Sequence, residues 1–178
     1  MNPGCNIKVW ASVHPRNLHQ LREMAALARE LSVGIEFFPL STIGGYNDAL
    51  LLGDSDRREA FATVRQLQEE GYPVRNPPRA LKIMAGDKPM ACNFGRISIH
   101  VDHEGQIYSC ENARGEPLHL WGRYGELDLD RLLASEELQA VGDRLRSCNQ
   151  CQLPCSVELS GNLTAALGGM FMRSLRLD

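Results

Sequence analysis

The chain has no long apolar run and no concentration of basic charge, and we expect no signal peptide. No stretch approaches the roughly 18–20 consecutive apolar residues that a membrane-spanning helix needs. The 19 Lys and Arg and 22 Asp and Glu residues give a net charge of −3 without a basic stripe, so a nucleic-acid partner is not expected. The first residues, MNPGCNIKVW, lack the basic and apolar regions of a secretory leader. We therefore expect a cytoplasmic protein without a membrane or nucleic-acid partner.

Catalytic signatures are also missing. No Ser/His/Asp spacing and no phosphate-binding glycine loop occurs in the sequence. The hydrophobic content of 43% and charged content of 23% describe a globular protein, and 178 residues suffice for one domain or two small lobes.

The N-terminal part alternates expected strands and helices. We predict a buried strand at 7–13, a helix at about 16–32 that ends just before Gly34, a second buried strand at 35–40 and a helix at about 56–70. Short connections between alternating strands and helices favour parallel packing, and we prefer it to an antiparallel α+β lobe. The positions expected to be buried on the two helices are Leu18, Leu21, Met24, Ala25, Ala28, Leu31, Ala60, Phe61, Val64 and Leu67.

The character of the chain changes at a proline-rich segment that includes Pro73, Pro77 and Pro78. We expect three parts: 1–76, a linker at 77–88, and a second lobe at 89–178. In that lobe, 96–102 and 106–110 predict a β-hairpin with a turn at Gly105. We expect His100 and His103, near this turn, to be surface residues. Helices are expected at 128–133, 135–146 and 163–175. The expected buried helix positions are Leu129, Leu132, Leu133, Leu138, Val141 and Leu145. The fold class expected is α/β, or α+β overall.

Five of the six cysteines form two groups in the second lobe. The first group is Cys92 and Cys110, and the second is Cys148, Cys151 and Cys155. Two thiolates separated by two residues can turn toward one ion or cluster. Cys110 ends the second hairpin strand, so it lies at the open end of the hairpin, and Cys92 can reach that end if the chain bends back. We therefore expect these sulfur atoms to converge.

The cysteine pattern allows four interpretations. Buried cysteines acting as small hydrophobic residues would explain one or two of them but not the later triplet. Disulfides would require an oxidising compartment. Structural zinc also uses four thiolates, although zinc ribbons usually pair two similar knuckles. We favour an iron–sulfur cluster and keep a zinc-stabilised, non-enzymatic interaction module as the alternative. Five candidate ligands exceed four sites, so one cysteine is surplus.

The cysteine pattern resembles a known domain. Cys92-x12-Gly105-x4-Cys110 followed by Cys148-x2-Cys151-x3-Cys155 looks like the SPASM/twitch auxiliary cluster domain of radical S-adenosylmethionine (radical SAM) enzymes. The segment VWASVHPRNLHQLREMAALARELSVGIEFFPL is similar to the late strand–helix–strand units of their partial (β/α) barrel. The resemblance implies one cluster, of 4Fe-4S type. It also implies Cys92 and Cys110 as hairpin ligands, with Cys148 and Cys151 completing the set.

One part of the family pattern is absent. These enzymes bind the cluster that cleaves S-adenosylmethionine through Cys-x3-Cys-x2-Cys, and this sequence has no such spacing, since Cys5 stands alone. We expect that the chain does not cleave S-adenosylmethionine alone and that this cofactor is used only when an N-terminal half is present. An open half-barrel starting at 7–13 would expose an apolar strand edge. We therefore expect the chain to be the C-terminal half of such an enzyme, or to work with a partner chain.

Overall fold

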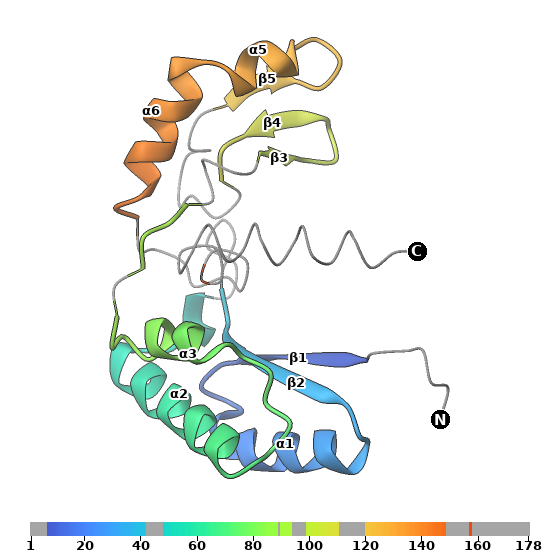
Figure 1. Ribbon diagram of the computed structural model, residues 1–178, viewed down its shortest axis with the longest axis vertical. Helices are drawn as coiled ribbons and strands as arrows, with labels where there is room; N and C mark the ends of the chain where they lie inside the picture. Colours follow the sequence, from blue (N-terminus) through green and yellow to red (C-terminus); the bar gives the residue numbers. More distant parts are fainter. Residues whose placement is uncertain are drawn as a thin grey trace. The chain divides into compact units, whose positions relative to one another are not determined.

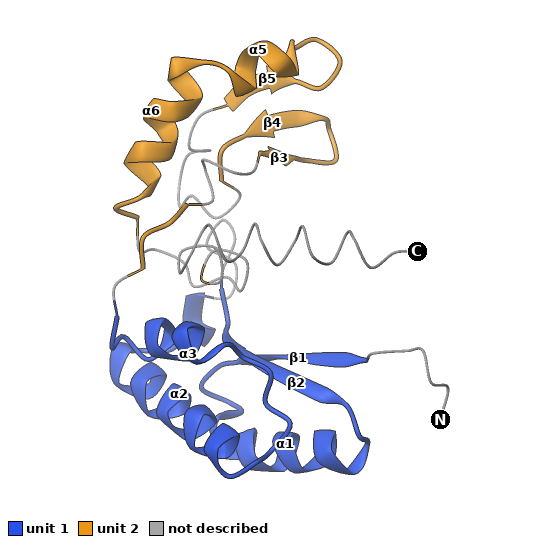
Figure 2. Cartoon of the chain, in the orientation of Figure 1, with its two compact units in different colours: residues 1–41, 47–89, 152–154 blue, residues 42–46, 90–151, 155–178 orange. Residues whose placement is uncertain are grey.

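A computed structural model describes residues 7–41, 48–88, 90–93, 99–110, 120–148 and 157. Within these residues the chain mixes helices and strands, as expected for an α+β protein, and it forms two compact units (Figures 1 and 2). The described part of the first unit is 7–41 and 48–88, and that of the second is 90–93, 99–110, 120–148 and 157. No described helix is both long and apolar enough to cross a membrane.

The first unit is built on parallel strands. Strand β1 (Lys8–Val13) pairs with β2 (Gly34–Pro39) in parallel register, and this confirms the parallel arrangement. Between them lie the 3-10 helix η1 (Leu18–Gln20) and helix α1 (Leu21–Glu30). A second short 3-10 helix, η2 (Asp48–Leu50), precedes helix α2 (Asp54–Glu69). Figure 1 shows α1 and α2 on one face of the two-stranded sheet.

The chain after α2 returns to the sheet as a third parallel segment. Val74 bridges Ile35, because the Ile35 N–H donates to Pro73 O at 3.0 Å and the Arg75 N–H donates to Ile35 O at 2.8 Å. Sequential parallel segments in the order β1, β2, Val74 are the order found in a (β/α) barrel and also in half of a doubly wound sheet. The described residues contain no closed barrel.

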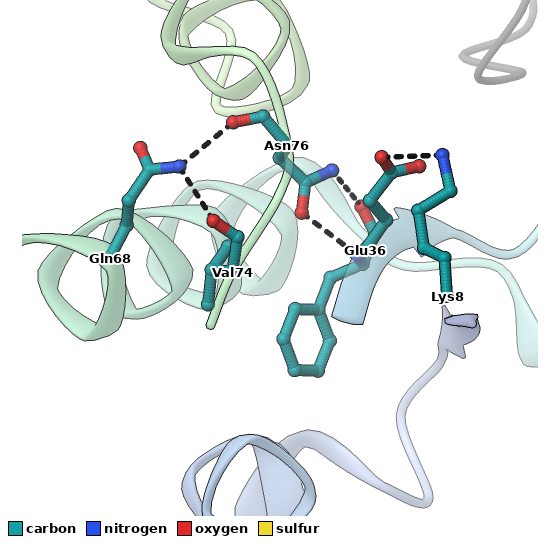
Figure 3. Close-up of polar contacts among 6 residues, drawn as sticks. Lys8, Glu36, Gln68, Val74 and Asn76 are labelled. Carbon is teal, nitrogen blue, oxygen red and sulfur yellow. Dashed lines mark hydrogen bonds and ion pairs between the residues drawn. The ribbon is translucent and has the colours of Figure 1, made fainter. Parts of the chain in front are cut away.

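A buried asparagine side chain extends this third segment. The Asn76 amide accepts a hydrogen bond from the Phe37 N–H at 2.9 Å and donates one to Phe37 O at 2.8 Å (Figure 3). Gln68 Nε2 in turn donates to Val74 O and Asn76 O at 3.1 and 2.9 Å. A side chain therefore pairs the β2 backbone where a further strand residue would otherwise be needed.

The core of the first unit follows the predicted helix faces. Strand β2 is buried from Ile35 through Phe38, so both of its faces are covered. The predicted positions on α2 are all buried. The buried side chains of the two helices are Leu21, Ala25, Ala28, Ala60, Phe61, Val64 and Leu67. Two predictions are wrong: Leu31 is 62% exposed, and β1 is not a buried strand, since Ile7 and Trp10 are 56% and 62% exposed.

The segment 77–88, predicted to be a linker, contains helix α3 (Pro78–Met84) and is part of the first unit. The apolar residues Ala80, Leu81, Ile83 and Met84 are buried, and α3 packs against α2. Arg57 of α2 also donates from Nη1 to Met84 O at 2.6 Å. The prolines begin this helix instead of opening a linker, because proline is favoured in the first helical turn.

The second unit contains a three-stranded antiparallel sheet and two helices. Strands β3 (His100–Val101), β4 (Gln106–Tyr108) and β5 (Leu120–Arg123) are ordered β3-β4-β5. Helices α5 (Leu129–Leu133) and α6 (Glu136–Leu145) follow. The hairpin and both helices were predicted, whereas β5 was not. The predicted burial of Leu133 on α5 is wrong, since this side chain is 57% exposed. The predicted helix at 163–175 lies outside the described residues.

Candidate metal centre

The hairpin turn sets the position of Cys110. Asp102 Oδ1 accepts hydrogen bonds from the Glu104 and Gln106 N–H groups, both at 2.9 Å, and the Gly105 N–H donates to Asp102 O at 3.0 Å. Gly105 has a φ of +78°, in the left-handed region that glycine adopts without strain, as predicted. The turn is therefore fixed by local chemistry at the end of the hairpin away from Cys110.

The pairing register of β3 and β4 can be extended along the hairpin toward Cys110. His100 pairs with Tyr108 and Val101 pairs with Ile107. Two further steps in this register would place Cys110 opposite position 98. Residues 94–98 lie outside the described residues, so this pairing stays a prediction.

Helix α6 leads directly to Cys148. Ser135 caps its beginning by accepting a hydrogen bond from the Leu138 N–H at 3.1 Å. At its end the Cys148 N–H donates to Leu145 O at 2.9 Å, which closes the last turn. The buried Leu138, Val141 and Leu145 hold the helix in the core of the second unit, so the position of Cys148 is tied to that core.

Three of the five candidate ligands lie in the described part of the chain, and all three belong to the second unit. Cys92 is buried at 5% exposure, and Cys110 and Cys148 are half-buried. The other two candidates, Cys151 and Cys155, lie outside the described residues, as does Cys5.

These three cysteines do not form a ligand set by themselves. Among the residues that the structure describes, no three His, Cys, Asp or Glu side chains are grouped closely enough to hold a metal ion. A four-thiolate centre would need Cys151, Cys155 or both, and these two cysteines lie outside the described residues. The described residues therefore do not test the predicted convergence of the sulfur atoms. The prediction for the ligand set therefore stays a prediction.

The chemistry of the candidate residues fits a thiolate-bound metal centre. Cysteine sulfur suits iron–sulfur clusters and zinc, and a buried thiol such as Cys92 becomes a ligand only as the thiolate that a metal stabilises. Beside Cys110, the hydroxyl of Ser109 is completely buried, and its Oγ has no hydrogen-bond partner in the described part of the chain. A buried donor without a partner is uncommon.

Two features near the hairpin were missed or misassigned. His100, which sequence reasoning placed on the surface, is half-buried and stacks on Tyr108 with ring centroids 5.7 Å apart and planes 17° apart. The two residues are direct cross-strand neighbours, so the alternation of the strand, combined with the turn position, could have revealed this pair. His103 is exposed, as predicted.

In the described part of the first unit, a buried carboxylate forms an ion pair that sequence reasoning also missed. Glu36 is 4% exposed, and its Oε1 is 2.7 Å from the Lys8 ammonium nitrogen (Figure 3). Lys8 also lies over the Trp10 ring, 5.4 Å from its centroid. The pair joins β1 to β2, because Lys8 and Glu36 lie on the same face of neighbouring strands.

Comparison with known proteins adds no assignment. No protein-family model matches the chain, and no curated protein matches it significantly.

Proposed function

We propose that the second unit binds one iron–sulfur cluster, of 4Fe-4S type, through four of the five cysteines. The candidate ligands are Cys92, Cys110, Cys148, Cys151 and Cys155. The observation that carries the proposal is their spacing, with a pair on a β-hairpin and a triplet after a helix. The placement of Cys92, Cys110 and Cys148 in one compact unit supports it.

The wider proposal is that the chain acts as the C-terminal half of a radical SAM enzyme with a SPASM/twitch-like cluster domain. The parallel β1-α1-β2-α2 arrangement and the third segment at Val74 support a segment of a (β/α) barrel. Such a cluster would supply electron transfer or a site for substrate beside a radical formed elsewhere. The protein would hold the cluster through thiolates.

The chain would not cleave S-adenosylmethionine by itself, because the sequence has no Cys-x3-Cys-x2-Cys. The part that binds this cofactor would come from an N-terminal half or from a partner chain. Activity is therefore expected of an assembly and not of this chain alone.

The direct test is metal analysis of anaerobically purified full-length protein. We expect about four iron atoms and four acid-labile sulfides per chain, with the brown colour of a thiolate-bound cluster. Zinc at one equivalent without sulfide would support the zinc module and overturn the iron–sulfur proposal.

Single Cys→Ser variants identify the ligands. We expect Cys92→Ser and Cys110→Ser to lose the cluster, and at least two of the three substitutions at 148, 151 and 155 to do the same. Cys5→Ser is the matched control and should retain full iron and sulfide. Retention of the cluster by Cys92→Ser or Cys110→Ser would contradict the hairpin ligand set.

A further inference from the structure

The outer edge of β1 offers unused backbone groups. The Gly34 N–H donates to Ile7 O at 3.4 Å and the Leu40 N–H donates to Val13 O at 2.8 Å, so the odd-numbered residues of β1 pair with β2. The N–H and C=O groups of Lys8 and Trp10 therefore point to the other side. No strand pairs with this edge in the described part of the chain.

Three apolar side chains along this edge are exposed. Ile7, Val9 and Trp10 are 56%, 41% and 62% exposed. Strand β1 carries one charged residue, Lys8, whose side chain is 41% exposed and whose ammonium group pairs with Glu36 of β2. The edge ends at Ser12, whose carbonyl oxygen accepts a hydrogen bond from Asn17 Nδ2 at 2.9 Å. The edge thus provides a short, defined pairing segment that contains no proline and whose single charge is already engaged by Glu36.

Helix α1 carries a second apolar surface on the same side. Arg22 contacts Glu70, and Arg22 and Arg29 lie over the Tyr72 ring, so this flank of α1 faces the end of α2. Leu27 and Leu31 lie roughly 150–170° around the helix from these arginines. They point away from α2, toward the β1 side, and are 54% and 62% exposed.

We propose that the β1 edge and the Leu27/Leu31 flank form one docking surface for a β/α unit of a partner polypeptide. The partner's strand would pair with Lys8 and Trp10, and its helix would pack on Leu27 and Leu31. This is the arrangement by which β2 and α2 already pack against β1 and α1 on the other side. Two neighbouring rows, one of backbone groups and one of leucines, match a strand with its helix better than an isolated peptide.

The charges beside the leucines favour a different polypeptide as the partner over a second copy of this chain. Glu23 and Glu30 are exposed and lie three or four residues from Leu27, so they border the leucines. Antiparallel pairing of two β1 edges would set two α1 helices antiparallel and bring Glu23 of one copy near Glu30 of the other. Like charges at such an interface are unfavourable. A partner helix with leucine-type contacts and Lys or Arg beside them would satisfy both features.

The inference rests on the proposed function only in expecting a separate catalytic partner. The surface itself belongs to the first unit and contains no cysteine. Loss of one proposal therefore leaves the other testable.

Site-specific photo-crosslinking of the full-length chain in its own cells tests the surface. The photoreactive residue p-benzoylphenylalanine replaces Leu27 in one variant, Trp10 in a second and the exposed Arg58 of α2 in a control. We expect crosslinks from positions 27 and 10 to one other polypeptide, with position 27 mapping to a helix that carries Lys or Arg and position 10 to the adjacent strand. Leu31→Glu should reduce crosslinking from position 10 at least about tenfold, because it places a charge in the apolar contact.

Four outcomes would overturn the proposal: crosslinks only to a second copy, equal crosslinking from position 58, no effect of Leu31→Glu, or no crosslinked product at positions 10 and 27. Leu31 is exposed, so Leu31→Glu should leave folding intact, which circular dichroism checks. Iron and sulfide are measured in the same preparations. Crosslinking without iron retains the docking surface and rejects the cluster, and iron without crosslinking does the reverse.

Discussion

Asn76 is a single residue on which the third segment of the first unit depends. It is 1% exposed, and its amide satisfies both backbone groups of Phe37, a residue that is fully buried. Asn76→Ala would leave two buried backbone groups without partners. We expect it to lower the free energy of unfolding by about 2–4 kcal/mol.

Urea denaturation of the full-length protein measures this change. Gln66→Ala is the matched control, because Gln66 is exposed and its side-chain amide donates a hydrogen bond to Glu70 Oε1 at 2.8 Å. We expect its effect to stay within about 0.5 kcal/mol. Equal effects of the two substitutions would show that Asn76 does not support β2.

The pair formed by Arg22 and Glu70 predicts a pH dependence. Arg22 nitrogens lie 2.5 and 3.1 Å from the two Glu70 carboxylate oxygens. The hydrogen bond from Arg22 lowers the pKa of Glu70, and the same partner raises the pKa of Arg22. Because the Glu70 pKa is lower in the folded protein, the pair's stabilisation is complete above the ordinary glutamate pKa of about 4.3 and is lost as pH falls through the folded value.

The test compares wild type with Glu70→Gln across the acid range. The difference in free energy of unfolding between the two proteins should be small, because both side chains are exposed. It should be constant near neutral pH and should vanish at low pH. The same substitution at Glu59 of α2 is the control and should keep the acid-dependent loss seen in wild type. A difference that grows toward low pH would have the wrong sign for this pair.

At the scale of elements, the end of α1 shows how one residue conformation ends a helix. The Val33 N–H donates to Ala28 O at 2.9 Å and the Ser32 N–H donates to Arg29 O at 3.1 Å, which is a Schellman motif. Ser32 has a φ of +55° and occupies the position where glycine is preferred. The expected stop at Gly34 is therefore wrong by two residues, and Gly34 instead begins β2.

We expect Ser32→Gly to raise the free energy of unfolding by about 0.5–1 kcal/mol, because glycine adopts positive φ without strain. The matched control is Ser55→Gly in the first turn of α2, where φ is helical. That change should lower stability by about 0.5 kcal/mol. Thermal or urea unfolding of both variants measures whether each change raises or lowers the free energy of unfolding. If both changes shifted it in the same direction, the explanation from backbone conformation would be contradicted.

Helices, strands and turns were predictable where one local sequence pattern determines the structure. The apolar face of α2, from Ala60 to Leu67, follows from helical spacing alone, and the Asp102–Gly105 turn follows from its residue types. Strand β5 was missed because four residues, one of them Gly122, give too little periodicity, and pairing with β4 decides its structure. Burial of β1 was also mispredicted, because β-branched composition does not tell an edge strand from a central one.

For the candidate site, the sequence predicts the elements that carry the cysteines but not how the cysteines are placed. Cysteine spacing proposes the ligands, which stay a prediction, whereas the hairpin and α6 formed where the sequence placed them. Whether Cys92 and Cys148 approach one centre is not specified by any local sequence rule. The stacking of His100 on Tyr108 required the exact strand register, which the short strands specify only together with the turn.

At the scale of the whole molecule, the chain divides into two compact units, each with buried apolar side chains among its described residues. The described core of the first unit contains large side chains from two strands and three helices, including Phe37, Phe61 and Met84. The described part of the second unit has a core of its own. Its buried apolar side chains are Cys92, Ile107, Leu132, Leu138, Val141, Leu145 and Val157. Cys92, Cys110 and Cys148 belong to this unit, so a metal bound through them would contribute to its folding free energy.

We therefore expect anaerobic removal of the metal to unfold the second unit and leave the first folded, since metal binding to thiolates contributes directly to folding. Hydrogen exchange followed by mass spectrometry measures both: amides of α6 should lose protection, and amides of α2 should keep it. The Cys5→Ser variant, treated in the same way, should behave as wild type. If α6 stays protected after metal removal, the cysteines do not hold this unit together; if α2 also loses protection, the two units do not unfold separately.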